Sequence, residues 1–118
     1  MRKTLLFSLL AIFLCIFAAP LPTISLTSAV VKVTAYCHSG RTASGIRVRE
    51  GILALSRDLE YQLSMRFGEL VKLEGLGTFT FEDRMASYKR RQADVWVPRY
   101  HEAMRFGVKY NILLVKVI

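Results

Sequence analysis

Cysteine and histidine are scarce in this chain, with two of each among 118 residues. Cys15 lies in the apolar N-terminal stretch, so a chain without that stretch keeps only Cys37 and can form no internal disulfide. His38 and His101 lack the carboxylate and cysteine partners that a zinc site needs. The sequence therefore predicts neither a disulfide framework nor a metal site, and it predicts no cofactor.

Acidic residues are also few. Nine Asp and Glu stand against 17 Lys and Arg, and the formal net charge is +8. On charge alone, peptidoglycan with its teichoic acids, lipid headgroups and nucleic acid are all possible partners. The sequence has no aromatic-basic stacking motif and no Cys/His cluster, so we do not predict nucleic-acid binding. It also carries no Ser–His–Asp or Cys–His signature of nucleophilic catalysis.

Long apolar runs are absent beyond the N-terminus. Two basic residues there precede an almost unbroken apolar run over residues 5–19, which is the polarity order of an export signal. A membrane-spanning helix needs about 20 apolar residues, whereas Pro20 and Pro22 interrupt this run early. We predict an N-terminal hydrophobic helix within residues 1–29 that acts as a cleaved signal peptide or as a retained membrane anchor.

Residues 27–29 (Thr-Ser-Ala) fit a signal-peptide cleavage site after Ala29, whereas cleavage after Ala19 would leave an unfavourable Pro20 at the new N-terminus. Removing residues 1–29 would lower the net charge from +8 to +6. Residues 30–118 are enough for one compact core. The predicted location is the periplasm or cell envelope, in association with the outer membrane or cell wall.

The first half of residues 30–118 predicts a strand, a basic loop, a second strand, a helix and a third strand. The strands are expected at 30–36, 51–55 and 69–74. Ser56 is a good N-cap for a helix that ends at Gly68. The helix is indicated by apolar residues at every fourth position: Leu55, Leu59, Leu63 and Phe67.

The second half repeats this plan. Strands are predicted at 77–82, 93–97 and 111–117, with a basic loop after the first of them. A helix should open at Pro98 and end at Gly107. The tetrapeptide Met-Arg-Phe-Gly occurs after the predicted helical pattern of both halves, which indicates a shared C-cap chemistry. Two interlocked halves of this kind would close a six-stranded barrel with two short helices.

Short motifs in a fixed order resemble one known family. They are 33–37 (VTAYC), 42–45 (TASG), 51–54 (GILA), 75–77 (GLG), 82–83 (ED), 93–96 (ADVW) and 103–107 (AMRFG). This set resembles the 3D domain, which is named for three aspartates and folds as a double-psi β-barrel. The resemblance extends from about residue 31 to the C-terminus.

The 3D family includes the barrel of membrane-bound lytic transglycosylase A, which cleaves the MurNAc–GlcNAc bond of peptidoglycan. The family's second and third aspartates stand eleven residues apart, as Asp83 and Asp94 do, and the third is catalytic. The resemblance implies that Asp94 is the catalytic acid, with Asp83 beside it. It also implies that peptidoglycan glycan strands are the substrate.

Two departures from the family leave an alternative open. Ser56 occupies the position of the first aspartate, and the family's glycine-rich loop is replaced by bulky basic residues over 84–92. Both departures favour a non-catalytic barrel that binds peptidoglycan or an envelope partner. A third possibility is an exported structural module on an anionic surface.

A lytic transglycosylase can work with one carboxyl group, because the substrate's MurNAc 6-hydroxyl is the nucleophile. The carboxyl group must begin protonated, so its pKa has to be raised. Trp96 alternates with Asp94 and would desolvate it or stack on a sugar ring. Phe79, Phe81 and Asp83 are expected on one face of the preceding strand, from which Asp83 would raise the pKa of Asp94.

The basic loop should act in the opposite direction on Asp94. Positive charge on Arg84, Lys89, Arg90 and Arg91 would hold the carboxyl group ionised. The loop is either a solvated surface segment or a contact for muramyl carboxylates and acidic peptide stems, with Arg84 as a substrate-binding candidate. Tyr36, Thr42 and Ser44 are candidates to line the cleft through hydroxyl groups, although turn chemistry explains them equally well.

Overall fold

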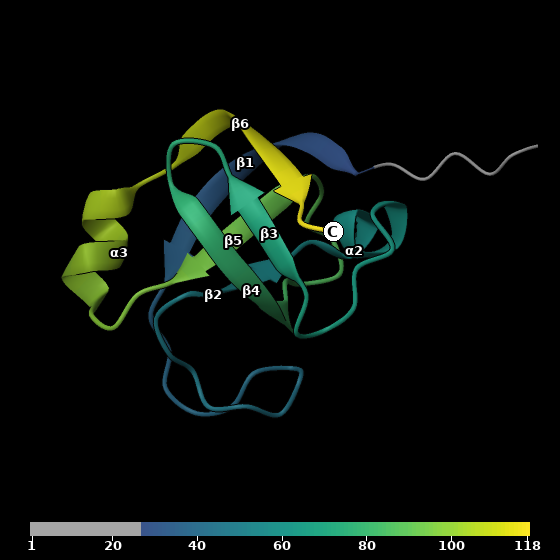
Figure 1. The fold of residues 1–118 in the computed structure, drawn as a ribbon. Helices are drawn as coiled ribbons and strands as arrows, with labels where there is room; N and C mark the ends of the chain where they lie inside the picture. The colour runs from purple at the N-terminus through teal and green to yellow at the C-terminus, as the bar shows by residue number, and fades with distance from the viewer. Residues whose placement is uncertain (1–26) are drawn as a thin grey trace, which may run out of the picture.

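A closed, mixed six-stranded barrel forms the domain in this computed structural model, which describes residues 27–118 (Figure 1). This mainly β fold with two short helices confirms the coarse prediction. The N-terminal hydrophobic helix is predicted within residues 1–29; residues 1–26 lie outside the described part, and Ser28 and Ala29 belong to β1 instead. The strands are β1 (Ser28–Tyr36), β2 (Ile52–Leu55), β3 (Leu70–Leu73), β4 (Gly77–Arg84), β5 (Gln92–Trp96) and β6 (Lys109–Lys116), and the helices are α2 (Arg57–Gln62) and α3 (Tyr100–Phe106).

The two halves of the chain interlock in the barrel. The strand order is β1-β5-β2-β4-β3-β6, so each of the six pairings joins a strand of one half to a strand of the other. The β1–β5 and β2–β4 pairs are parallel, and the other four are antiparallel. Exchanging β1 with β4, β2 with β5 and β3 with β6 preserves every pairing and direction. The barrel therefore has the predicted plan of two similar halves.

Apolar side chains fill the barrel because successive residues of a strand point to opposite faces. Val31 and Val33 of β1, for example, are buried, while Lys32 between them is on the outer face. Leu59 of α2 and Leu63, which follows the helix, extend this core beyond the barrel wall. The buried core comprises Val31, Val33, Leu53, Leu55, Leu59, Leu63, Met65, Val71, Leu73, Phe81, Ala93, Val95 and Leu114.

Both helices differ in extent from their predictions. Helix α2 ends at Gln62 instead of Gly68, because Ser64 adopts a left-handed backbone with φ of 49° that no α-helix continues through. Helix α3 begins at Tyr100, two residues later than the predicted start at Pro98. Gly107 does end α3, at a φ of 65°. The repeated Met-Arg-Phe-Gly sequence is therefore a helix C-cap in the second half only.

Ser56 occupies the N-cap position of α2, as predicted, but its side chain does not cap the helix. The residue is fully buried, and its Oγ accepts a hydrogen bond of 3.1 Å from the backbone N–H of Gln92. Ser56 therefore links the start of α2 to the start of β5.

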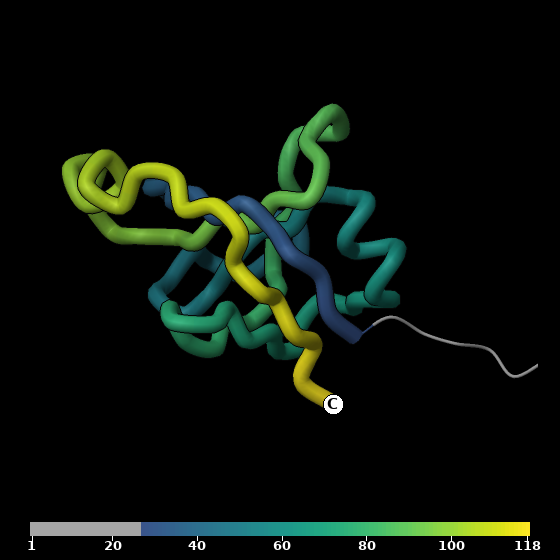
Figure 2. The backbone as a smooth tube through the Cα atoms, turned by 90° about the horizontal axis from the view of Figure 1, so that it is seen from above, coloured from purple at the N-terminus to yellow at the C-terminus, as the bar shows by residue number. Residues whose placement is uncertain are grey.

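A projecting loop and the β1–β6 strand pair are two further features of the fold. Residues 85–91, between β4 and β5, project as a loop from the barrel (Figure 2). Strands β1 and β6 lie side by side, and Thr27 contributes a backbone hydrogen bond to Lys116 at the end of that pair. Neither helix of residues 27–118 has the length and apolar character needed to cross a membrane.

Candidate functional site

A β-bulge in β4 decides the direction of Asp83. Leu53 of β2 pairs with Phe81 of β4. The next residue, Ala54, pairs with Asp83 and so skips one position of β4. Phe81 faces the core, whereas Asp83 lies on the outer face with Ala54. The prediction that Phe79, Phe81 and Asp83 share one face is therefore wrong, because the bulge reverses the alternation after Phe81.

Four residues form a row across the outer face of β1, β5, β2 and β4. Thr34 pairs with Asp94, Asp94 with Ala54, and Ala54 with Asp83. Paired residues point to the same face, and neighbouring strands are about 4.8 Å apart, so the two aspartate Cα atoms are roughly 10 Å apart. The small Ala54 side chain between them leaves room for a cleft of about 380 Å³, which is also lined by Tyr36.

Opposing influences act on the pKa of the Asp94 carboxyl group. Burial raises the pKa of the Asp94 carboxyl group. A hydrogen bond of 2.9 Å from the Thr34 hydroxyl and the positive charge of Lys89 lower this pKa, and the negative charge of Asp83 raises it, as predicted. The combined effect is a raised pKa. The Thr34 hydroxyl is itself held by a 3.0 Å hydrogen bond from Gln92, so the donor has a defined orientation.

Asp83 anchors the neighbouring chain segments. Its Oδ1 accepts hydrogen bonds from the backbone N–H groups of Ala43 and Arg84, at 3.0 and 2.9 Å. Its Oδ2 accepts a bond of 3.1 Å from the Tyr36 hydroxyl. Burial, and next the charge of Asp83, raise the pKa of the Tyr36 phenol, which keeps it protonated as a donor. Asp83 thus fastens the loop before β2 and holds the phenol at the cleft.

The basic residues after Asp83 mainly contact groups other than Asp94. The Arg84 guanidinium binds Glu60 through two nitrogens, at 2.7 and 2.9 Å, and lies 4.5 Å from the centre of the Phe67 ring. Arg90 donates to two carbonyl groups of its own loop. Of the four basic residues predicted to lower the pKa of Asp94, Lys89 is the one that does so.

Three predicted binding residues lie outside the cleft lining. The Thr42 and Ser44 hydroxyls are 3.0 Å apart, and Ser44 also donates to the buried carboxylate of Glu82. The Trp96 Nε1 donates to the His38 carbonyl at 2.9 Å. These residues shape the loop between β1 and β2, whereas Tyr36 and Arg84 do line the cleft.

Sequence reasoning missed His38, which lines the cleft, and Thr34, which donates a hydrogen bond to Asp94. The His38 ring stacks on Tyr36 with centroids 5.5 Å apart and lines the cleft, but no sequence pattern indicated this. Thr34 could have been predicted, because it lies two residues before Tyr36 on β1 and so points to the same face. Among residues 27–118, no group of three His, Cys, Asp or Glu side chains is arranged to hold a metal ion.

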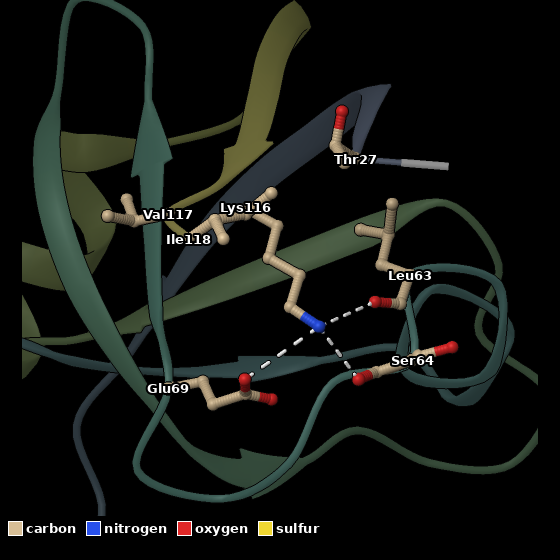
Figure 3. A pocket seen from close by; sticks show the side chains of 7 residues that line it. All are labelled: Thr27, Leu63, Ser64, Glu69, Lys116, Val117 and Ile118. Carbon is tan, nitrogen blue, oxygen red and sulfur yellow. Dashed lines mark hydrogen bonds and ion pairs between the residues drawn. The ribbon is translucent and has the colours of Figure 1, made fainter. Parts of the chain in front are cut away.

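A second cleft, of about 360 Å³, lies where the C-terminus meets Thr27 and the turn after α2 (Figure 3). Lys116 points into it and donates to the carbonyl groups of Leu63 and Ser64 at 3.1 and 2.9 Å. Its ammonium group is also 3.7 Å from Glu69. These contacts occupy Lys116, so the residue joins β6 to the segment after α2. The cleft contains no predicted site residue.

The fold and site together define a small, closed, mixed β-barrel with a carboxylate cleft on its outer face. No protein-family model and no curated protein sequence matches the chain. Among solved structures the chain is similar to Streptomyces papain inhibitor, with a TM-score of 0.58 and 18% sequence identity. The match covers 82% of this chain and 100% of that chain. At this identity the similarity concerns the fold alone.

Proposed function

We propose that this protein is an exported cell-wall protein of the 3D-domain type that cleaves the MurNAc–GlcNAc bond of peptidoglycan as a lytic transglycosylase. The observation that carries the proposal is Asp94: a largely buried carboxyl group with a raised pKa that faces an open cleft. The interlocked halves, with parallel β1–β5 and β2–β4 pairs, support a double-psi form of the barrel. Export through residues 1–29 would bring the cleft to its substrate.

In the proposed reaction, protonated Asp94 donates its proton to the glycosidic oxygen as the bond to the MurNAc anomeric carbon breaks. The MurNAc 6-hydroxyl oxygen then forms a bond to that carbon, and its proton passes to the Asp94 carboxylate. The products are a 1,6-anhydro sugar and a free hydroxyl on the leaving sugar, and Asp94 regains its proton. No water molecule is consumed.

The other cleft residues would position the sugar and its charges. The carboxylate of Asp83, across Ala54 from Asp94, would favour positive charge at the anomeric carbon. Its three hydrogen bonds give it a fixed orientation, which electrostatic stabilisation requires. Lys89 lines the same cleft and makes no ion pair with another residue of 27–118, so it is available to a muramyl carboxylate.

A non-catalytic barrel that binds peptidoglycan or an envelope partner is the second candidate. The fully buried Ser56, at the position of the family's first aspartate, supplies no carboxylate to the cleft. Streptomyces papain inhibitor, according to its name, acts on a protease, so a barrel of similar fold serves inhibition in that protein.

Digestion of purified sacculi separates the two candidates. The proposed enzyme releases 1,6-anhydro-muropeptides, detectable by mass spectrometry, and D94N should lower the yield at least 100-fold because the proton donor is lost. E102Q, which neutralises a carboxylate on α3 away from the cleft, should leave the yield unchanged. Absence of anhydro products from folded protein, with sacculus binding retained, would instead support the binding barrel.

A further inference from the structure

We propose that a separate basic cleft, between the start of β1 and the loop before β5, is a binding site for a phosphate group. The cleft has a volume of about 370 Å³. Its polar side chains are Lys32, Arg90, Arg91, Tyr110 and Asn111, and no acidic residue lines it. These side chains present hydrogen-bond donors from three cations, a phenol and an amide, which is the chemistry that an oxyanion requires.

The three cations are positioned without being neutralised. Arg90 donates through Nη1 to the carbonyl groups of Ser87 and Lys89, at 2.8 and 3.0 Å. Arg91 donates through Nη2 to the carbonyl group of Val30 at 3.3 Å. Within residues 27–118, neither arginine nor Lys32 forms an ion pair, and residues 1–26 contain no Asp or Glu. The positive charges at the cleft are therefore available to a ligand.

Two residues that line this cleft have a left-handed backbone. Arg91 and Asn111 adopt left-handed conformations, with φ of 49° and 56°. They are two of the three non-glycine residues with positive φ in the described part of the chain, and both line the cleft. Asparagine adopts this conformation readily, whereas arginine does so at a cost, and such strain concentrates at functional sites. A hydrogen bond of 3.0 Å between the Lys32 N–H and the Arg91 carbonyl group fixes the loop there.

The charge of the cleft selects the class of ligand. A carboxylate supplies one negative charge for three cations, whereas a phosphate monoester carries about −1.5 to −2 charges at neutral pH. Arginine forks match two phosphate oxygens at once. A phosphate monoester can be presented by a soluble or wall-bound molecule or by the headgroup of phosphatidic acid, and both sources share this chemistry.

The phosphate site does not depend on the proposed glycan cleavage, although the two clefts are neighbours. Lys32, Thr34 and Tyr36 alternate along the outer face of β1 and connect the basic cleft to the Asp94 cleft. Four strand residues span roughly 13 Å, so one extended polymer could contact both.

Titration with glycerol 3-phosphate tests the proposal on the full chain in non-ionic detergent. Calorimetry at low salt gives the affinity, and amide chemical shifts locate the ligand. The triple variant K32Q/R90Q/R91Q should bind at least tenfold more weakly. The matched variant R49Q/R99Q/R105Q removes the same charge from exposed positions outside the cleft and should stay within twofold of the unaltered protein.

Three outcomes would overturn the proposal. They are an equal loss of affinity for glycerol 3-phosphate in both triple variants, ligand-induced changes in amide chemical shift only at residues outside the cleft, or binding of acetate as tight as that of glycerol 3-phosphate. Thermal unfolding of each variant establishes that it is folded. Vesicles that contain phosphatidic acid, whose headgroup is a phosphate monoester, and vesicles of phosphatidylcholine alone then identify the source of phosphate. Selective loss of binding to the phosphatidic acid vesicles in the first variant supports a lipid headgroup. Unchanged vesicle binding, with glycerol 3-phosphate binding lost, supports a soluble or wall-bound ester. Neither result bears on the proposed glycan cleavage, which sacculus digestion tests separately.

Discussion

At the residue scale, two aspartates on the same barrel face have different surroundings. Asp94 is largely buried and accepts one side-chain hydrogen bond, from Thr34, and its pKa is raised by burial. Asp83 accepts three hydrogen bonds, two of them from backbone N–H groups. The first arrangement suits a group that exchanges a proton, and the second suits a group that holds its neighbours in place.

The raised pKa of Asp94 predicts a pH-dependent stability. The folded protein binds this proton more tightly than the unfolded chain, so the associated stability is complete below about pH 4 and is lost as the pH rises through the folded pKa. D94N has no such proton. The free energy of unfolding of D94N relative to the unaltered protein should therefore rise between pH 3 and pH 7 in urea titrations.

The variant D58N is a control, for which the pH dependence of stability should have the opposite sign. Burial opposes ionisation of Asp58, but hydrogen bonds, including one of 3.0 Å from the Arg91 N–H, hold its pKa below its usual value. The stability from Asp58 is therefore present above about pH 4 and is lost on acidification. D58N should lose stability relative to the unaltered protein as the pH rises. A pH-independent difference for D94N would contradict its assigned environment.

Ser56 provides a second residue-scale prediction. S56A removes the acceptor of the buried Gln92 N–H, so the free energy of unfolding should fall by about 1–3 kcal/mol. S39A, at an exposed loop position, should change it by less than about 0.5 kcal/mol. Equal effects of both substitutions on urea unfolding would show that the Ser56 hydrogen bond contributes little.

At the element scale, small irregularities decide what the strands present. The bulge in β4 directs Phe81 inward and Asp83 outward, which regular alternation would not allow. Strand β1 begins at Ser28, so the fitting cleavage position after Ala29 lies within a paired strand. Ser28 and Ala29 pair with β6, and Thr27 accepts a hydrogen bond of 2.7 Å from the Lys116 N–H.

A chain that begins at Val30 should consequently be less stable than one that begins at Thr27. Losing two or three net hydrogen bonds predicts a decrease of about 1–3 kcal/mol in the free energy of unfolding. Deleting the terminal Ile118, which is 99% exposed, is the matched truncation and should have little effect. Urea unfolding measures all three chains. Equal stability of the chains that begin at Val30 and Thr27 would contradict the prediction.

At the scale of the whole molecule, no barrel pairing is formed within one half of the chain. Strands β1, β2 and β3 each pair with two strands of the second half, and none pairs within its own half. The core is likewise assembled from both halves. A half barrel would leave every strand edge unpaired and much apolar surface exposed.

Separate fragments 27–75 and 76–118 should therefore be unfolded as monomers and should fold together when mixed. Circular dichroism and amide chemical-shift dispersion would be recorded for each fragment and for the equimolar mixture. The unsplit 27–118 chain is the reference for the mixed sample. A folded monomeric fragment would refute the interlocked description of the fold.

Much of the fold could be predicted, but parts of the candidate site could not. Local apolar patterns located all six strands to within two residues at each end, and four-residue apolar spacing, Pro98 and Gly107 indicated the two helices. It could not anticipate the left-handed backbone at Ser64, which ends α2 early. Nor could it place Asp83, because a bulge depends on how β4 pairs with β2.

The sequence by itself determined the order of strands and helices, the two similar halves and the excess of positive charge, because these follow from local periodicity and composition. Only the tertiary structure decided which polar groups meet. The Thr34–Asp94 and Tyr36–Asp83 hydrogen bonds join residues 60 and 47 positions apart. Such contacts depend on strand order and register, and a shift of one residue in a strand turns each side chain to its opposite face.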